Sequence, residues 1–133
     1  MVAAKAIFRN ARIKNLSMTD ARQKAEDYFY NGLDLYSEGK HDEAIAEYRR
    51  AVEADPSYTD ALHGLARIYQ DLGRLDEAIE ISQKLANLDP DDVLPHTSLS
   101  ILYQKKGMIP EAEAEANKAR VLGWKQQLKK SST

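Results

Sequence analysis

A spacing of 34 residues recurs along the chain and constrains its fold more than any other feature. Three kinds of residue keep this step, namely glycines at 39, 73 and 107, glutamates at 43, 77 and 111, and alanines at 44, 78 and 112. The pairs Asp55-Pro56 and Asp89-Pro90 are separated by the same distance. A fixed period of this length predicts stacked supersecondary units, each of which buries its apolar face against a neighbour.

Each period contains the pattern of two helices. Between Asp42 and Asp55, apolar residues recur at the spacing of one helix face. Gly39 and its two counterparts suit the positive φ of a helix end, and an Asp-Pro pair ends the second helix because proline cannot continue it. We therefore expect helices at about 20–36, 42–55, 58–71 and 76–88, followed by a pair that begins near Asp92 and Pro110.

Small residues recur where the paired helices should cross. Gly32, Ala66 and Ser100 keep the same step of 34 on the first helix, and Ala44, Ala78 and Ala112 keep it on the second. Two small side chains at a crossing permit the short end of the usual interaxial distances.

The two ends of the repeat region carry their own signals. Ser17-Met18-Thr19-Asp20 fits a capping box that would start the first long helix. At the other end Gly123 is expected to break the pattern. Residues 124–130 would then add capping turns, with Trp124 and Leu128 facing inward and lysines facing water. We expect a basic leader at 1–19, three repeats within 20–123 (about 25–58, 59–92 and 93–123), and a capping turn with a basic tail at 124–133.

The leader has apolar residues at helical spacing and a basic stripe formed by Lys5, Arg9 and Arg12. Three interpretations remain open. The leader is a frayed terminus, a helix that docks on the protein's own groove or on a partner, or, as a minor option, a helix on a membrane surface. In the second interpretation Ile7 and Phe8 would cover an apolar patch of the first repeat.

Charge is distributed unevenly. The chain has a net charge of −2, yet residues 117–133 contain five lysines and arginines and no acidic residue. Residues 1–24 are also basic, whereas the acidic residues are concentrated between them. Basic ends on an acidic body can pair internally or reach an acidic partner. Without cysteines, a secretory signal or a long apolar run, the default location is the cytoplasm.

No catalytic constellation is present in the sequence, so we do not expect an enzyme. Phosphate-binding glycine loops and nucleophile motifs are missing, and His41, His63 and His96 have no second ligand at the spacing that metals require. We expect no metal and no cofactor. The C-terminal lysines lack the stacking aromatics of a nucleic-acid site, so nucleic-acid binding is not expected either.

The repeat residues resemble those of the tetratricopeptide-repeat (TPR) family. The first unit matches the family's pattern with Tyr28, Gly32, Ala44, Tyr48 and Pro56, and the second matches it with Leu65, Ala66, Tyr69, Ala78 and Pro90. The third unit has Gly123-Trp124 in place of the Asp-Pro ending. The resemblance implies an all-α fold, a right-handed α-solenoid of three helix-turn-helix units with a short C-terminal capping helix.

The resemblance also implies a concave groove lined by the first helix of each unit. Its candidate partner-binding residues are Phe29, Tyr30, Leu33, Tyr36, His63, Arg67, Gln70, Leu94, Ile101 and Lys105. Some family members clamp the carboxylate of a chaperone tail with lysine, asparagine and arginine. The corresponding places here are Phe29, Leu33, Gly64, Leu94 and Ser98, which offer no cation, so binding of chaperone tails is not expected.

Two functions are consistent with these features. The chain is an adaptor or scaffold that binds a protein segment in its groove, or it is a permanent accessory subunit of a larger complex. Self-association through the apolar end of the groove stays open. An adaptor should exchange, whereas a subunit should co-purify at a fixed ratio through high salt.

Overall fold

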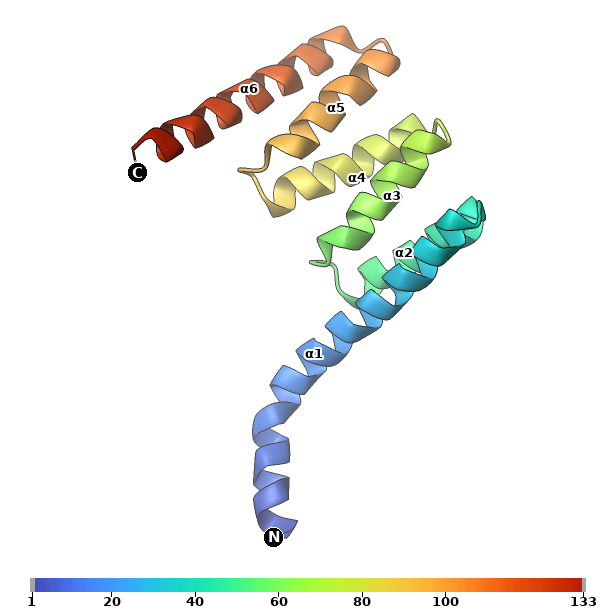
Figure 1. Cartoon of the computed structure of the whole chain (residues 1–133), viewed down its shortest axis with the longest axis vertical. Coiled ribbons are helices and arrows are strands. Elements are labelled where there is room, and N and C mark those ends of the chain that lie inside the picture. Colours follow the sequence, from blue (N-terminus) through green and yellow to red (C-terminus); the bar gives the residue numbers. More distant parts are fainter. Residues whose placement is uncertain (1, 133) are drawn as a thin grey trace. The chain divides into compact units, whose positions relative to one another are not determined.

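The computed structural model describes the backbone of residues 2–132 and the side chains of residues 19–132. This part of the chain forms six α-helices and no strand (Figure 1). The helices are α1 (Val2–Ser37), α2 (His41–Ala54), α3 (Thr59–Asp71), α4 (Leu75–Leu88), α5 (Val93–Lys105) and α6 (Ile109–Ser131). The expected all-α class is confirmed. Contacts divide the chain into two compact units, Met1–Ala61 and Leu62–Thr133, and each is described by itself.

The same turn joins the two helices of each predicted repeat. Gly39, Gly73 and Gly107 have φ values of 80°, 71° and 78°, the left-handed conformation that glycine adopts without a steric penalty. The residue after each glycine donates its backbone N–H to the carbonyl five residues earlier, as Lys40 does to Leu35 at 2.9 Å. This Schellman arrangement satisfies carbonyls that the helix end would leave unpaired. The predicted role of the three glycines is therefore confirmed.

Small residues do lie at the helix crossings. In the first unit α1 packs on α2, and a Cβ added to Gly32 would lie 2.7 Å from the ring of Tyr48 and 3.3 Å from the carbonyl oxygen of Ala44. In the second unit the Ser100 hydroxyl of α5 donates to the Ala112 carbonyl of α6 at 2.9 Å. The crossing residues predicted from the spacing are thus in contact in both units.

Apolar side chains fill the interior of each unit. In the first unit, Ala25, Ala51, Tyr58 and Ala61 form a buried cluster, against which Phe29 and other partly buried side chains pack. In the second unit, α4 packs on α5 and α5 packs on α6. Its fully buried large side chains are Leu62, Ile68, Tyr69, Leu99 and Leu102.

The Asp-Pro pairs end α2 and α4 as expected. After α2, the Asp55 carboxylate accepts hydrogen bonds from the backbone N–H and the hydroxyl of Ser57 at 3.1 and 2.7 Å. After α4, Asp89 accepts from the backbone N–H of Asp91 at 3.2 Å. Asp92 caps α5 by accepting from the backbone N–H of Leu94 at 3.0 Å, as predicted.

The predicted start of the first helix is wrong. Ser17–Asp20 lies inside α1, which runs without interruption from Val2 to Ser37. Residues 2–16 contain alanines, lysines and arginines and no glycine or proline, so nothing in them stops a helix. The side chains of the basic stripe at Lys5, Arg9 and Arg12 lie outside the residues whose side chains are described.

The predicted break at Gly123 is also wrong. Helix α6 continues through Gly123 to Ser131, so the expected capping turns are the last turns of α6 and not a separate element. A single glycine costs a helix interior only about 1 kcal/mol, and no proline follows it here.

Candidate functional site

The apolar patch predicted on the first repeat consists of Phe29, Tyr30, Leu33 and Tyr36, which lie on α1 and differ in exposure. Tyr30 is 58% exposed and Leu33 is 43% exposed. Phe29 is half-buried, with its ring centroid 5.6 Å from that of Tyr48 and 5.7 Å from that of Tyr58. Tyr36 is half-buried against His41. Tyr30 and Leu33 are therefore the contact residues available to a partner, and Phe29 and Tyr36 support them.

A polar corner lies beside this patch, at the turn between α2 and α3. Arg22 of α1 approaches the Asp55 carboxylate at 3.5 Å and lies over the Tyr58 ring at 4.6 Å from its centroid. The hydrogen bond from the Ser57 hydroxyl, with help from Arg22, lowers the pKa of Asp55. Burial raises the pKa of Tyr58, and the nearby carboxylates of Asp60 and Glu26 raise it further. These contacts fix the α1 backbone that presents Tyr30 and Leu33.

The continuous α1 helix is incompatible with a leader that folds back over its own patch. At 1.5 Å per residue, position 8 lies about 30 Å along the helix axis from position 29. The helix therefore carries the backbone of residues 7 and 8 away from this patch, and the side chains of Ile7 and Phe8 lie outside those that are described.

The other predicted groove residues lie on α3 and α5 of the second unit. His63 and Arg67 are exposed and Gln70 is half-buried, and Arg67 approaches Asp71 at 3.5 Å. On α5, Leu94 is 65% exposed, Ile101 is 48% exposed and Lys105 is exposed. These side chains are accessible to a partner, and none of them lines the pocket described next.

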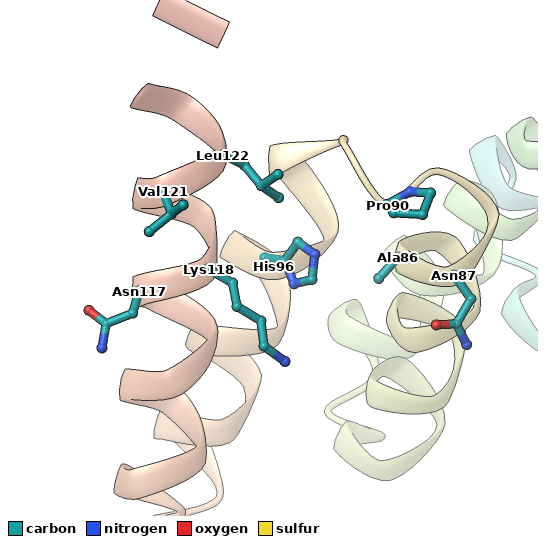
Figure 2. Close-up of a pocket in the computed structure, with 8 residues that line it drawn as sticks. All are labelled: Ala86, Asn87, Pro90, His96, Asn117, Lys118, Val121 and Leu122. Atoms are coloured by element: carbon teal, nitrogen blue, oxygen red, sulfur yellow. The ribbon is translucent and has the colours of Figure 1, made fainter. Parts of the chain in front are cut away.

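A pocket of about 610 Å³ lies instead among α4, α5 and α6. Figure 2 shows Leu122 of α6 and Ala86 of α4 on either side of it, with His96 of α5 between them. Asn87, Pro90, Asn117, Lys118 and Val121 complete the lining. No sequence pattern indicated this pocket, because its walls come from three helices whose relative placement no local pattern specifies.

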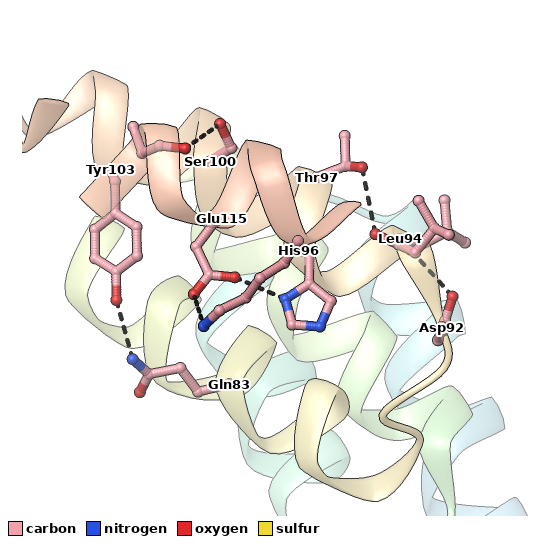
Figure 3. Close-up of polar contacts among 11 residues, drawn as sticks. Gln83, Asp92, Leu94, His96, Thr97, Ser100, Tyr103 and Glu115 are labelled. Atoms are coloured by element: carbon pink, nitrogen blue, oxygen red, sulfur yellow. Dashed lines mark hydrogen bonds and ion pairs between the residues drawn. The ribbon is translucent and has the colours of Figure 1, made fainter. Parts of the chain in front are cut away.

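One wall of this region carries a polar cluster that the sequence analysis missed (Figure 3). His96 Nδ1 and Glu115 Oε2 are 2.6 Å apart, and each side chain is only 13% exposed. Glu115 also forms an ion pair with Lys118, three residues further along α6, at 3.1 Å. A second link between helices joins Gln83 of α4 to the Tyr103 hydroxyl of α5 at 3.0 Å. The 19-residue separation of His96 and Glu115 left no signal in the sequence, since only the packing of α5 on α6 brings them together.

The predicted inward orientation of Trp124 and Leu128 is wrong. Trp124 is 67% exposed and Leu128 is 58% exposed. The end of α6 is held by another contact, in which the Gln126 side chain donates to the Asp91 carbonyl at 2.8 Å. Gln126 thus faces the α4–α5 connection, and the two apolar side chains face outward.

Two further observations concern the part of the chain whose side chains are described. No group of three histidine or carboxylate side chains is arranged to hold a metal ion there. Among those residues no helix combines the length and apolar character needed to cross a bilayer.

Comparison with known proteins identifies the family. A family model described as tetratricopeptide repeat matches residues 35–100, and solved structures of the same fold align over most of the chain. The chain belongs to the tetratricopeptide-repeat family. The helical solenoid implied by the resemblance is thereby confirmed.

Two similar proteins are longer than this TPR chain. The crystal structure of MamA superimposes with a TM-score of 0.74 at 27% identity, covering 86% of this chain and 66% of MamA. Photosystem I assembly protein Ycf3 of Synechococcus sp. (strain CC9605) is 27% identical over 110 residues, which are 80% of this chain and 64% of that protein. The chain therefore spans less than two thirds of the length of each.

A third likeness concerns the fold alone. The second TPR of Spaghetti (RPAP3), solved bound to the HSP90 peptide SRMEEVD, superimposes with a TM-score of 0.69 at 20% identity. The match covers 81% of this chain and 98% of that domain. The 34-residue unit of this TPR chain therefore has the arrangement of helices seen in a peptide-binding domain, with different side chains on it.

Proposed function

We propose that this TPR chain is a non-enzymatic protein-interaction module that holds a segment of a partner protein on the exposed face of α1. The observation that carries the proposal is the exposure of Tyr30 (58%) and Leu33 (43%) one turn apart on a helix whose other side is packed against α2. Exposed apolar side chains that lie together commonly mark an interface, and tyrosine is among the residues that anchor interfaces.

The surroundings of Tyr30 and Leu33 favour a binding role over a structural one. Phe29, beneath them, packs between Tyr48 and Tyr58, so the α1 backbone is held in place before a partner arrives. Binding of a partner then costs little free energy for ordering the site, because the site is already ordered. On the second unit, taken by itself, Leu94 and Ile101 of α5 are exposed and, with Arg67 and Lys105, are proposed as contacts for a partner segment.

Similarity to other proteins supports the general role and not a particular partner. One relative is an assembly protein, and one protein of the same fold was solved with a peptide bound. Binding of chaperone tails stays unexpected, since Phe29, Leu33, Gly64, Leu94 and Ser98 carry no charge for a terminal carboxylate. The cytoplasm stays the predicted location.

A photo-crosslinking experiment in the native host tests the proposal. A benzophenone amino acid replaces Tyr30 in one version of the chain and Leu72 in the other, since Leu72 is 42% exposed but lies at the turn between α3 and α4. We expect a discrete crosslinked product from position 30 and not from position 72. Equal products from both positions, or none from position 30, would contradict the proposal.

Whether the partner stays bound to the chain through a high-salt wash distinguishes an adaptor from a permanent subunit. A permanent subunit keeps its partner at a fixed ratio through a high-salt wash, whereas an adaptor exchanges with added free chain. We propose the adaptor, because the exposed part of the α1 patch is small compared with the interfaces of obligate complexes.

A further inference from the structure

The last part of α6 carries a second apolar surface that the proposed function does not use. Asn117, Val121, Trp124 and Leu128 are separated by four, three and four residues, the spacing of the contact positions in a coiled coil. All four side chains are exposed, with Val121 at 53%, Trp124 at 67% and Leu128 at 58%. We refer to these four residues as the α6 seam.

The seam lies on the side of α6 opposite to the one that packs on the rest of the unit. Ala112 is buried, and Ala116, Ala119 and Leu122 are half-buried, so these residues mark the packed side. Gln126, on the same side, bonds to the Asp91 carbonyl. At 100° per residue the packed positions and the seam point in opposite directions. The seam is therefore an unpartnered helix face, of which only Asn117 and Val121 reach the edge of the pocket between α6 and its neighbours.

Basic residues flank the seam. In a coiled coil, the charges at the positions beside the contact positions decide which helices pair. In α6 these flanking positions are occupied by Lys118, Arg120, Lys125 and Gln127. Three are basic and none is acidic. Glu115 already holds Lys118 at 3.1 Å, but no ion pair of Arg120 or Lys125 is found in the described part of the chain. Their charges are available to an incoming acidic group.

This charge pattern disfavours a second copy of the chain as the occupant. If two copies met in parallel along the seam, Arg120 would face Lys125 of the other copy. If they met antiparallel in the register that aligns the four seam residues of each copy, Lys118 would face Lys125 and Arg120 would face Gln127. Like charges at these positions oppose pairing, and opposite charges select a partner.

A membrane surface is also disfavoured. The stripe takes up only two of every seven positions along α6, which is the width of the contact surface between two paired helices. One of its four residues is an asparagine. A helix that lies in a bilayer interface requires a broader apolar face.

We propose that the α6 seam binds an acidic amphipathic helix of a partner protein, with glutamate or aspartate beside its own apolar stripe. The pocket of about 610 Å³ supports this placement, because Asn117 and Val121 of the seam belong to its lining together with Ala86, Pro90 and Leu122. One large side chain of the partner helix fits into this pocket beside the seam. The chain then has two separate binding surfaces, one on α1 and one on α6.

The test uses Trp124 as its reporter, since it is the only tryptophan of the chain. The probes are two designed three-heptad peptides with leucine at the contact positions and a side-chain crosslink that holds the helix. They differ only at the flanking positions, which are glutamate in one peptide and lysine in the other. We expect the glutamate peptide to shift the Trp124 emission to shorter wavelength and to bind at least ten times more tightly than the lysine peptide.

Charge reversal provides the matched comparison. Arg120→Glu/Lys125→Glu should reverse the preference, so that the lysine peptide binds more tightly. Lys129→Glu/Lys130→Glu introduces the same change in charge on the same helix but away from the seam, and it should leave the order of the peptides unchanged. Circular dichroism of both variants checks that the fold is retained, as expected for exposed positions.

Several outcomes would overturn the proposal. Equal binding of the two peptides, no emission shift with either, or the same effect from both double variants would each do so. An emission shift that depends on the concentration of the chain alone would point to self-association. A shift with phosphatidylglycerol vesicles but not with the glutamate peptide would point to a membrane surface. None of these measurements involves α1, so failure here leaves the proposed function untouched.

Discussion

At the scale of single residues, Gly32 shows how one missing side chain sets the distance between two helices. Tyr48 occupies the space that a Cβ at this position would need, 2.7 Å away. The second unit has Ala66 and Ser82 at the corresponding places, a larger residue paired with a smaller one. In each unit at least one residue of the pair is small, which lets the two helices approach closely.

Two glycine substitutions test this interpretation. We expect Gly32→Ala to lower the free energy of unfolding by roughly 1–3 kcal/mol, because the buried Tyr48 ring must move. Gly123→Ala is the control. It also lies in a helix, but an added Cβ meets nothing within 4 Å, so it should stabilise the chain by about 0.5–1 kcal/mol. Urea denaturation measures both, and a loss of stability in both variants would contradict the account.

Two serine substitutions should also have opposite effects. The Ser82 side chain is buried, and its hydroxyl has no hydrogen-bond partner among the described residues. Ser82→Ala removes an unsatisfied polar group and should stabilise the chain by about 1 kcal/mol. Ser100→Ala removes the hydrogen bond to Ala112 and should destabilise it by about the same amount. Thermal unfolding of the two variants measures both effects. A lower stability of Ser82→Ala would contradict the assignment of its hydroxyl as an unsatisfied polar group.

At the scale of helices and turns, most of the structure follows from signals close together in the sequence. The ends at Gly39, Gly73 and Gly107, the Asp-Pro turns and the Asp92 cap are each specified by a few neighbouring residues. The two wrong boundaries, at Ser17 and Gly123, have one cause. A residue pattern that can start or stop a helix does so only where the residues next to it do not favour the helix. At both positions here, the residues on each side favour the helix.

The candidate site was harder to predict, for a related reason. The helical spacing of Tyr30 and Leu33 placed them on α1, but only the structure distinguishes them from Phe29, which packs between two tyrosines. Trp124 was expected to face inward because a terminal cap must cover the last repeat with one of its faces. Its exposure follows from the rotation of α6 on α5, which the sequence does not determine.

The turn between α2 and α3 should make stability depend on pH. Hydrogen bonds from Ser57 hold the pKa of Asp55 below its usual value, so the stabilisation is complete above about pH 4 and is lost as the pH falls through the lowered pKa. Ser57→Ala should therefore cost about 1 kcal/mol at neutral pH and less in acid. Urea denaturation at both pH values measures this.

Ser37→Ala is the control for the turn. Its hydroxyl donates to the backbone carbonyl of Asp34, which does not titrate, so its effect should be independent of pH. A cost of Ser57→Ala that stays constant into acid would contradict the role assigned to the Asp55 carboxylate.

At the scale of the whole molecule, the N-terminal turns of α1 extend beyond the end of α2. Helix α2 has only 14 residues, about 21 Å, whereas α1 has 36. The contact of Arg22 with Asp55 already lies just past Ala54, the last residue of α2. Deleting residues 2–16 should lower the helical signal in circular dichroism and shift the midpoint of thermal unfolding by less than about 4 °C. A much larger shift would mean that the leader packs on the repeats.

The central claim is that the chain holds a partner protein through Tyr30 and Leu33. The most direct measurement is the affinity of the partner recovered by crosslinking, determined by titration calorimetry. Tyr30→Ala/Leu33→Ala should weaken it at least tenfold, about 1.4 kcal/mol or more. Leu72→Ala/Leu88→Ala removes two similarly exposed leucines elsewhere and should leave it unchanged. Wild-type affinity in the α1 variant, with its helical content intact, would contradict the claim.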